Sequence, residues 1–349
     1  MANGPAALSC ADRVRRRLGL LLAGLAAAGA GMVAGLAWGA WTGSAALADQ
    51  AAPRAAAQPK RARPTPTAPT ARPSAATGDR TEPRPEEYPP ARLVAACEKK
   101  AAEIRAKLGP KIQAISRPPF VVAGDVSAER LDTYARWSVL RPAKAMWAAY
   151  FDKKPTEVIT IFLFAGKDNY VPYARGDYPA GDQPYFGYYM PTDRRLVMDI
   201  NTGTGTLVHE LTHALIVYDF PHLPTWFNEG LASLHEQCSV KEDTVVGLTN
   251  WRLAGLQAAI VNDKLRPLRD LVTKRDFYGR LQGANYAQAR YFVMYMQTKG
   301  LLANFYKHFR SHHTGADADV KAIEHVFDRK LPDIEKQFLA WVKTLRFER

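Results

Sequence analysis

Apolar positions recur with two different spacings along this chain, and the change of spacing separates a sheet region from a helical region. Residues 157–164 are mostly β-branched or aromatic, which is typical of a buried strand. Residues 186–190 and 196–200 flank a Pro-Thr-Asp-Arg turn and predict a hairpin. From residue 204 onward the apolar spacing is mostly that of a helix. The predicted helices are 204–218, 225–237, 250–261, 286–299, 301–312, 317–327 and 331–345.

Two more helices are predicted before the sheet region, over 92–108 and 127–151. A small sheet followed by many helices is typical of the α+β class. We therefore expect residues 92–349 to form an α+β domain with a small mixed sheet and a largely helical C-terminal part.

The first 48 residues have the parts of an export signal. Arginines at positions 13, 15, 16 and 17 precede an uncharged run from 18 to 48. The run ends in Ala-Leu-Ala, the small-x-small form of a cleavage site, but it is also long enough to span a bilayer, which takes about 20 residues. Residues 1–48 are therefore either a cleaved signal peptide or an uncleaved membrane anchor. Both place the rest of the chain outside the cytoplasm, in the periplasm or cell envelope.

Residues 49–91 are predicted to be a disordered linker rich in alanine and proline. The stretch 50–91 holds 10 of the 24 prolines and a single aromatic residue, Tyr88. Such a segment cannot bury enough apolar surface to order itself. We expect it to act as a flexible stalk for the C-terminal domain.

Charge and cysteine content narrow the class of partner. The chain has 47 basic and 34 acidic side chains, a net charge of +13, with no basic run interleaved with aromatic residues in the C-terminal part. This pattern predicts no nucleic-acid partner. Cys97 and Cys238 are the only thiols after the export segment. They either pair in an oxidising compartment or remain unpaired in the core.

The predicted helix 204–218 contains the motif H-E-x-x-H, formed by His209, Glu210 and His213. Histidines four residues apart lie on one face of a helix, so both imidazoles can bind one metal ion. Glu210 lies one residue further round the helix, near the ion but free to act as a base on a water molecule. The motif therefore predicts a hydrolytic metal site.

A third ligand is expected on the next helix, over 225–237. It carries the sequence Trp-Phe-Asn-Glu-Gly-Leu-Ala-Ser, in which the glutamate is Glu229. Two imidazoles and one carboxylate leave a fourth position open, as in catalytic zinc sites. The lack of a thiolate also favours Zn²⁺ over metals that prefer soft ligands. The predicted zinc ligands are His209, His213 and Glu229.

These two segments resemble the gluzincin metallopeptidases, and the resemblance covers about residues 185–300. The W-F-N-E-G-L-A-S block is similar to the W-L-N-E-G-F-A-S block of zinc aminopeptidases of the alanyl-aminopeptidase type. Only 15 residues separate His213 from Glu229, a few fewer than in those enzymes, and there is no G-A-M-E-N segment to hold a free amino terminus. The chain is more similar to the peptidase-MA-like domains of exported bacterial proteins. The resemblance implies a zincin-like fold and a peptidase that is not an aminopeptidase.

The resemblance also implies catalytic roles for two residues. Glu210 would activate water and then protonate the leaving amine. Tyr286 follows Glu229 at a distance comparable to that of the family's catalytic tyrosine, so it would donate a hydrogen bond to the oxyanion. Packing in the core is the alternative for Tyr286. Arg290 is a further candidate for binding a substrate carboxylate or carbonyl.

Three other features of this region have structural or supporting interpretations. Ser233 either orients a metal ligand or faces a neighbouring helix. Asn228 is predicted to be a packing or capping residue. By analogy with zincin-like folds, the strand 196–200 is expected to be an edge strand that pairs with an extended substrate.

Two classes of function are consistent with these residues. The first is a zinc peptidase of the cell envelope, with a peptide or protein as its substrate and a membrane contact if the N-terminal segment is not cleaved. The second is a metal-loaded, non-catalytic module that binds a partner or organises the envelope. Glu210 favours the first, because a binding module has no physical need for a base beside the metal.

Overall fold

The computed structural model describes residues 87–177, 186–315 and 317–347. The predicted signal peptide or anchor over 1–48, and all but the last residues of the predicted linker 49–91, lie outside these ranges. Among the described residues, no helix combines the length and apolar character needed to cross a bilayer. The described part is a mixture of helices and a small mixed sheet, which confirms the α+β class.

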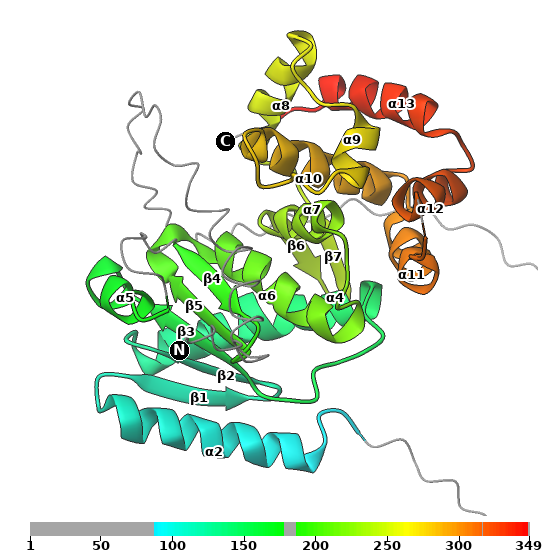
Figure 1. The fold of residues 1–349 in the computed structure, drawn as a ribbon. Coiled ribbons are helices and arrows are strands. Elements are labelled where there is room, and N and C mark those ends of the chain that lie inside the picture. The colour runs from blue at the N-terminus through cyan, green and yellow to red at the C-terminus, as the bar shows by residue number, and fades with distance from the viewer. Residues whose placement is uncertain (1–86, 178–185, 316, 348–349) are drawn as a thin grey trace, which may run out of the picture. The chain divides into compact units, whose positions relative to one another are not determined.

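A five-stranded mixed sheet lies in the N-terminal half of the described fold (Figure 1). Its spatial order is β1 (Gln113–Arg117), β2 (Phe120–Gly124), β3 (Ile159–Phe164), β5 (Arg195–Asp199) and β4 (Gly187–Met190). β2, β3 and β5 are parallel, and β1 and β4 are antiparallel edge strands. The predicted hairpin is confirmed as β4–β5. The expectation of an edge strand over 196–200 is wrong, because β5 pairs with β3 on one side and β4 on the other.

Helices cover both faces of the sheet because its central strands are apolar on both sides. In β3, Phe162 and Phe164 join the core under α2 (Ala91–Leu108) and α5 (Lys167–Ala174). Ile161 and Leu163 point the other way, into the larger core. That face is covered by α6 and by one continuous helical segment (Figure 1). The bounds are α3 (Ala128–Tyr134), the π-helical η1 (Ala135–Leu140), α4 (Arg141–Ala149) and α6 (Thr204–Asp219).

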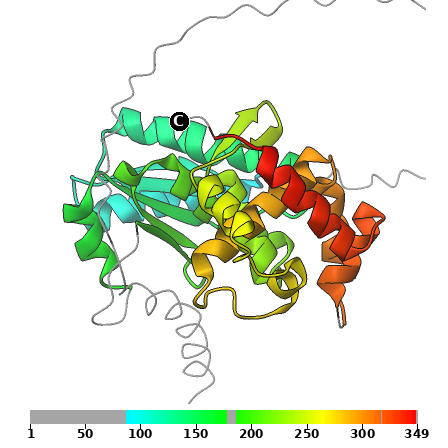
Figure 2. The same ribbon diagram turned by 90° about the horizontal axis from the view of Figure 1, so that it is seen from above.

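The chain after β5 is mainly helical, as predicted. A short 3₁₀ turn, η2 (Ile200–Thr202), leads from β5 into α6. The later helices are α7 (Thr225–His235), α8 (Arg252–Val261), α9 (Leu268–Thr273), α10 (Gln282–Thr298), α11 (Leu302–His312), α12 (Ala318–Phe327) and α13 (Leu331–Thr344). Figure 2 shows α10, α11 and α13 grouped at one end of the sheet region. A hairpin of β6 (Cys238–Lys241) and β7 (Thr244–Gly247), which was not predicted, separates α7 from α8.

Both cysteines of the described region are unpaired. Cys97 is buried in the core between α2 and the sheet, and Cys238 is half-buried at the start of β6. Of the two alternatives for these thiols, the structure therefore has the one without a disulfide. Burial raises the pKa of each thiol to about 11, so both are protonated at neutral pH.

Candidate metal centre

Two helices that pack against each other hold the site, α6 with the H-E-x-x-H motif and α7 with Glu229. Buried Leu207, Leu211 and Leu215 anchor one face of α6 in the core. His209 and His213 lie one turn apart, and their rings meet edge to face with centroids 4.7 Å apart. The apolar spacing of the sequence thus orients both imidazoles towards α7.

Close packing behind α7 fixes the position of its carboxylate. Gly230, the residue after Glu229, faces α10, and a Cβ atom at Gly230 would lie 2.9 Å from Val293 and 3.0 Å from the Ala289 carbonyl oxygen. Glycine is therefore required for the observed approach of the two helices. The Glu229 side chain is only 6% exposed and points towards the histidines.

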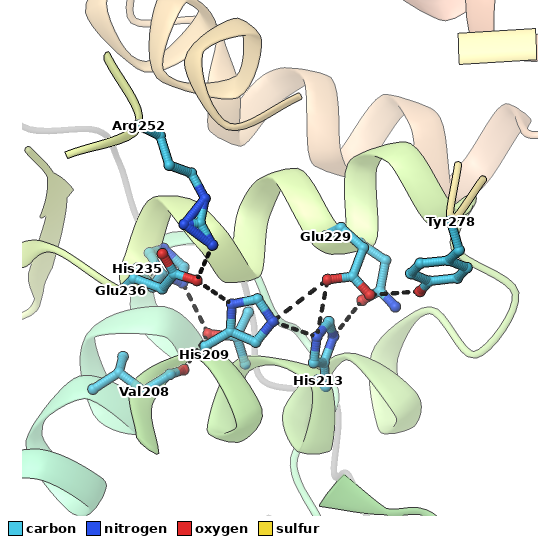
Figure 3. Close-up of polar contacts among 10 residues, drawn as sticks. Val208, His209, His213, Glu229, His235, Glu236, Arg252 and Tyr278 are labelled. Carbon is cyan, nitrogen blue, oxygen red and sulfur yellow. Dashed lines mark hydrogen bonds and ion pairs between the residues drawn. The ribbon is translucent and has the colours of Figure 1, made fainter. Parts of the chain in front are cut away.

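The ligand atoms of the three predicted zinc ligands converge (Figure 3). The two Nε2 atoms of His209 and His213 are 3.0 Å apart. The Oε2 atom of Glu229 lies 3.4 Å from the first and 3.6 Å from the second. A tetrahedral zinc ion with bonds of about 2.0–2.1 Å requires ligand atoms about 3.3 Å apart. The triangle therefore has the size of one face of a zinc coordination tetrahedron, and these residues can hold a metal ion.

The electrostatics of the group also fit a cation. Glu229 Oε2 is buried with no hydrogen-bond partner among the described residues. Burial alone would lower the pKa of His209, but the nearby carboxylates of Glu229 and Glu236 raise it to about 10. Burial would raise the pKa of Glu229, but His213 and His209 hold it well below its usual range. The pocket thus stabilises positive charge, which a divalent ion supplies when the imidazoles are neutral.

Each histidine is oriented by a second polar group at its far nitrogen. His209 Nδ1 lies 3.1 Å from Glu236 Oε1, and Arg252 lies 3.1 Å from the same carboxylate oxygen (Figure 3). His213 Nδ1 lies 3.0 Å from the amide oxygen of Asn228. Such partners fix the tautomer and orientation of a metal-binding histidine. Asn228, predicted to be a packing or capping residue, therefore contacts a ligand directly.

Ser233 does not take the orienting role that was one of its two interpretations. It is fully buried, and within the described ranges its hydroxyl oxygen has no hydrogen-bond partner. Glu236, three residues later, contacts His209 instead. Glu236 is the C-cap residue of α7 and has helical backbone angles, so it lies two turns after Glu229 on the same face of the helix and reaches His209 from there.

Glu210 lies in the same site. Burial raises its pKa, and the nearby His209 and His213 oppose that shift. The backbone N–H of Tyr189 on the edge strand β4 donates a hydrogen bond to the Glu210 carboxylate. The carboxylate therefore lies between α6 and the edge strand β4.

Two tyrosines surround Glu229, and sequence reasoning identified one of them. Tyr286 on α10 is hydrogen-bonded to Glu229. Burial, and to a smaller extent the negative charge of this carboxylate, raises the pKa of Tyr286 well above its ordinary value. Tyr278, in the loop before α10, donates a 2.6 Å hydrogen bond to Glu229 Oε1 (Figure 3). No periodic pattern marks Tyr278, because it belongs to neither a helix nor a strand.

The interpretation of Arg290 as a substrate-binding residue is wrong. The side chain is fully buried in α10, and it donates a hydrogen bond to the Leu248 carbonyl oxygen. A substrate cannot reach it there. Arg290 instead adds positive charge near Glu236 and helps to lower the pKa of that carboxylate, whose pKa burial would otherwise raise.

No known protein family matches this chain, and no curated protein sequence is significantly similar to it. The site therefore rests on its own geometry, a buried His-His-Glu group that can hold a metal ion within an α+β fold.

Proposed function

We propose that this chain is a zinc-dependent peptidase of gluzincin type that acts in the cell envelope. The observation that carries the proposal is the triangle of His209, His213 and Glu229, combined with a carboxylate on the next residue of the same helix. A purely structural metal site would need a fourth protein ligand and would have no use for Glu210.

The chain's own residues have distinct tasks in this proposal. Zn²⁺, when bound, supplies a Lewis acid that polarises a carbonyl oxygen and lowers the pKa of water. Glu210 accepts a proton from the attacking water and donates it to the leaving nitrogen. Its raised pKa suits this exchange, because a base with a pKa closer to neutrality returns the proton more readily.

The edge strand β4 supplies a surface for an extended peptide. Among the described residues β4 is an edge strand that pairs with β5 alone. It packs against α6, and its residue Tyr189 contacts Glu210 through the backbone. A peptide that added to β4 as a further strand would pass beside the proposed base. This role belongs to β4 and not to the strand 196–200.

Tyr278 and Tyr286 are the two candidates for the oxyanion donor. Both hydroxyl groups remain protonated at neutral pH, since burial and Glu229 raise both pKa values. We expect Tyr286→Phe to lower kcat by about 10²-fold or more with little change in KM, because an oxyanion donor acts in the transition state. Tyr278→Phe is the matched variant, and a larger loss there would reassign the role.

The test of the proposal is cleavage of a diverse peptide mixture, read by mass spectrometry. The full chain loaded with zinc is compared with Glu210→Gln and with Glu103→Gln, an exposed control on α2. We expect cuts from the wild type and the control that are lost in Glu210→Gln. Cuts at internal bonds would agree with the predicted lack of aminopeptidase activity. A folded, zinc-loaded wild type that makes no cuts would support the non-catalytic binding module instead.

A further inference from the structure

Three histidines outside the proposed active site stand together on the C-terminal helices. His308 and His312 are one turn apart on α11, and His325 lies on α12, which packs against α11. The ring of His308 stacks on both others, with centroids 4.3 Å from His312 and 4.1 Å from His325. His308 is half-buried, whereas the other two are exposed. The fold thus brings together three potential metal ligands from two helices.

The nitrogens of this cluster are largely unused by the protein. His312 Nδ1 pairs with the His308 carbonyl oxygen at 2.9 Å, which leaves its Nε2 atom available. For the ring nitrogens of His308 and His325, the described residues provide no hydrogen bond or ion pair. Burial and the two neighbouring imidazoles lower the pKa of His308, so it is neutral at physiological pH, as a metal ligand must be.

The positions of the three histidines on α11 and α12 allow them to bind one metal ion together. Imidazoles at positions i and i+4 of a helix can reach one ion, and a third imidazole from the adjacent helix completes a set of three. In the stacked arrangement the nitrogens do not yet converge, because the group with convergent ligand atoms in the described residues is His209, His213 and Glu229. Exposed side chains change rotamer within nanoseconds, so His312 and His325 can turn their edges towards an ion.

We propose that His308, His312 and His325 form a second metal site, which binds a divalent transition ion such as Zn²⁺ or Ni²⁺ through three imidazoles and joins α11 to α12. All-imidazole ligand sets favour these ions over Mg²⁺ or Ca²⁺, which require oxygen ligands. The cross-link stabilises the helix that anchors α6, because Tyr306 and Arg310 of α11 bind the buried Asp219 at the end of α6. The site is independent of the proposed peptidase activity.

The test counts metal ions on the full chain, purified without a histidine tag. Equilibrium dialysis against Zn²⁺ is followed by elemental analysis. We expect two equivalents on the wild type and one on the His308→Gln/His325→Gln variant. The His209→Gln/His213→Gln variant is also expected to retain one equivalent of Zn²⁺. The His222→Gln/His313→Gln variant, which also loses two histidines, serves as the control and is expected to retain two equivalents.

A second measurement separates loss of the site from loss of the fold. In the His209→Gln/His213→Gln background, Ni²⁺ is expected to raise the melting temperature, and adding His312→Gln is expected to abolish that rise. His312 is exposed at the end of α11, so its replacement leaves the core intact. The proposal is overturned if the His308→Gln/His325→Gln variant binds as many equivalents of Zn²⁺ as the wild type. A rise in melting temperature with Ni²⁺ that persists in the His312→Gln variant also overturns the proposal.

Discussion

Replacing Gly230 by alanine tests whether the close packing of α7 on α10 positions the metal ligand before it. The added Cβ atom would lie 2.9 Å from Val293 and 3.0 Å from the Ala289 carbonyl oxygen. Val293 can turn its methyl group away, but the carbonyl oxygen is fixed in the α10 backbone. The helices must therefore separate by a few tenths of an ångström. Overpacking of this kind costs about 1–3 kcal/mol, against about 0.5–1 kcal/mol gained from alanine in a helix, so we expect a net loss of about 1–2 kcal/mol.

Gly255→Ala provides the matched control. Gly255 is also inside a helix, α8, but an added Cβ atom there has no neighbour within 4 Å. We expect the free energy of unfolding of this variant to rise by about 0.5–1 kcal/mol, because alanine favours a helix more than glycine does. Urea unfolding measures the change in the free energy of unfolding of each variant, and competition with a chelator measures its zinc affinity. Gly230→Ala is expected to bind zinc more weakly because α7 carries Glu229, whereas Gly255→Ala keeps the wild-type affinity. Equal stability changes, or an unchanged zinc affinity in Gly230→Ala, would contradict this account of α7.

Three further predictions concern the surroundings of the site. Glu236→Leu is expected to weaken zinc binding by about 10–100-fold, measured by chelator competition, because it removes the partner of His209 Nδ1; Glu236→Gln, which retains an acceptor, is expected to lose much less. Asp219→Ala is expected to cost about 3 kcal/mol in urea unfolding, because it removes the buried partner of Arg310, and an effect below about 1 kcal/mol would refute this. Burial, aided by Arg290, lowers the pKa of His235 to about 3. The unfolded imidazole therefore takes up a proton near pH 6.5 while the folded one remains neutral, and stability is lost as the pH falls from 6.5 towards 3, by up to about 1.4 kcal/mol per pH unit. Urea unfolding at pH 7 and pH 5 should show a smaller loss in His235→Gln than in the wild type.

Much of the fold could be predicted because its signals are local. The apolar periods located β3, the β4–β5 hairpin and, apart from the six-residue α9, the helices from α6 onward. The H-E-x-x-H motif places two imidazoles on one helical face regardless of context. Strand order is not local. β4 and β5 are both short and apolar, and only the pairing of β5 with β3 determines which of them is the edge.

The outer part of the site was less predictable for the same reason. Glu236 is the C-cap residue of α7, and its contact with His209 depends on how α7 packs against α6. Tyr278 lies in a loop whose course is set by α9 and α10. Arg290 lies in an aromatic stripe of α10, and a charged residue at such a position suggests a functional surface. Its full burial instead follows from the packing of α10 against α7 and α8.

The sum of the charges around the site affects which reaction a bound metal ion could support there. Within the described residues, Glu229 and Glu210 together offset the charge of a divalent ion bound at His209 and His213. The adjacent Glu236 is accompanied by both Arg252 and the buried Arg290, which leaves one positive charge in excess. Buried charge of this kind is costly unless it is balanced. If the chain is the peptidase proposed above, a substrate group that becomes negative as it reacts would balance this charge.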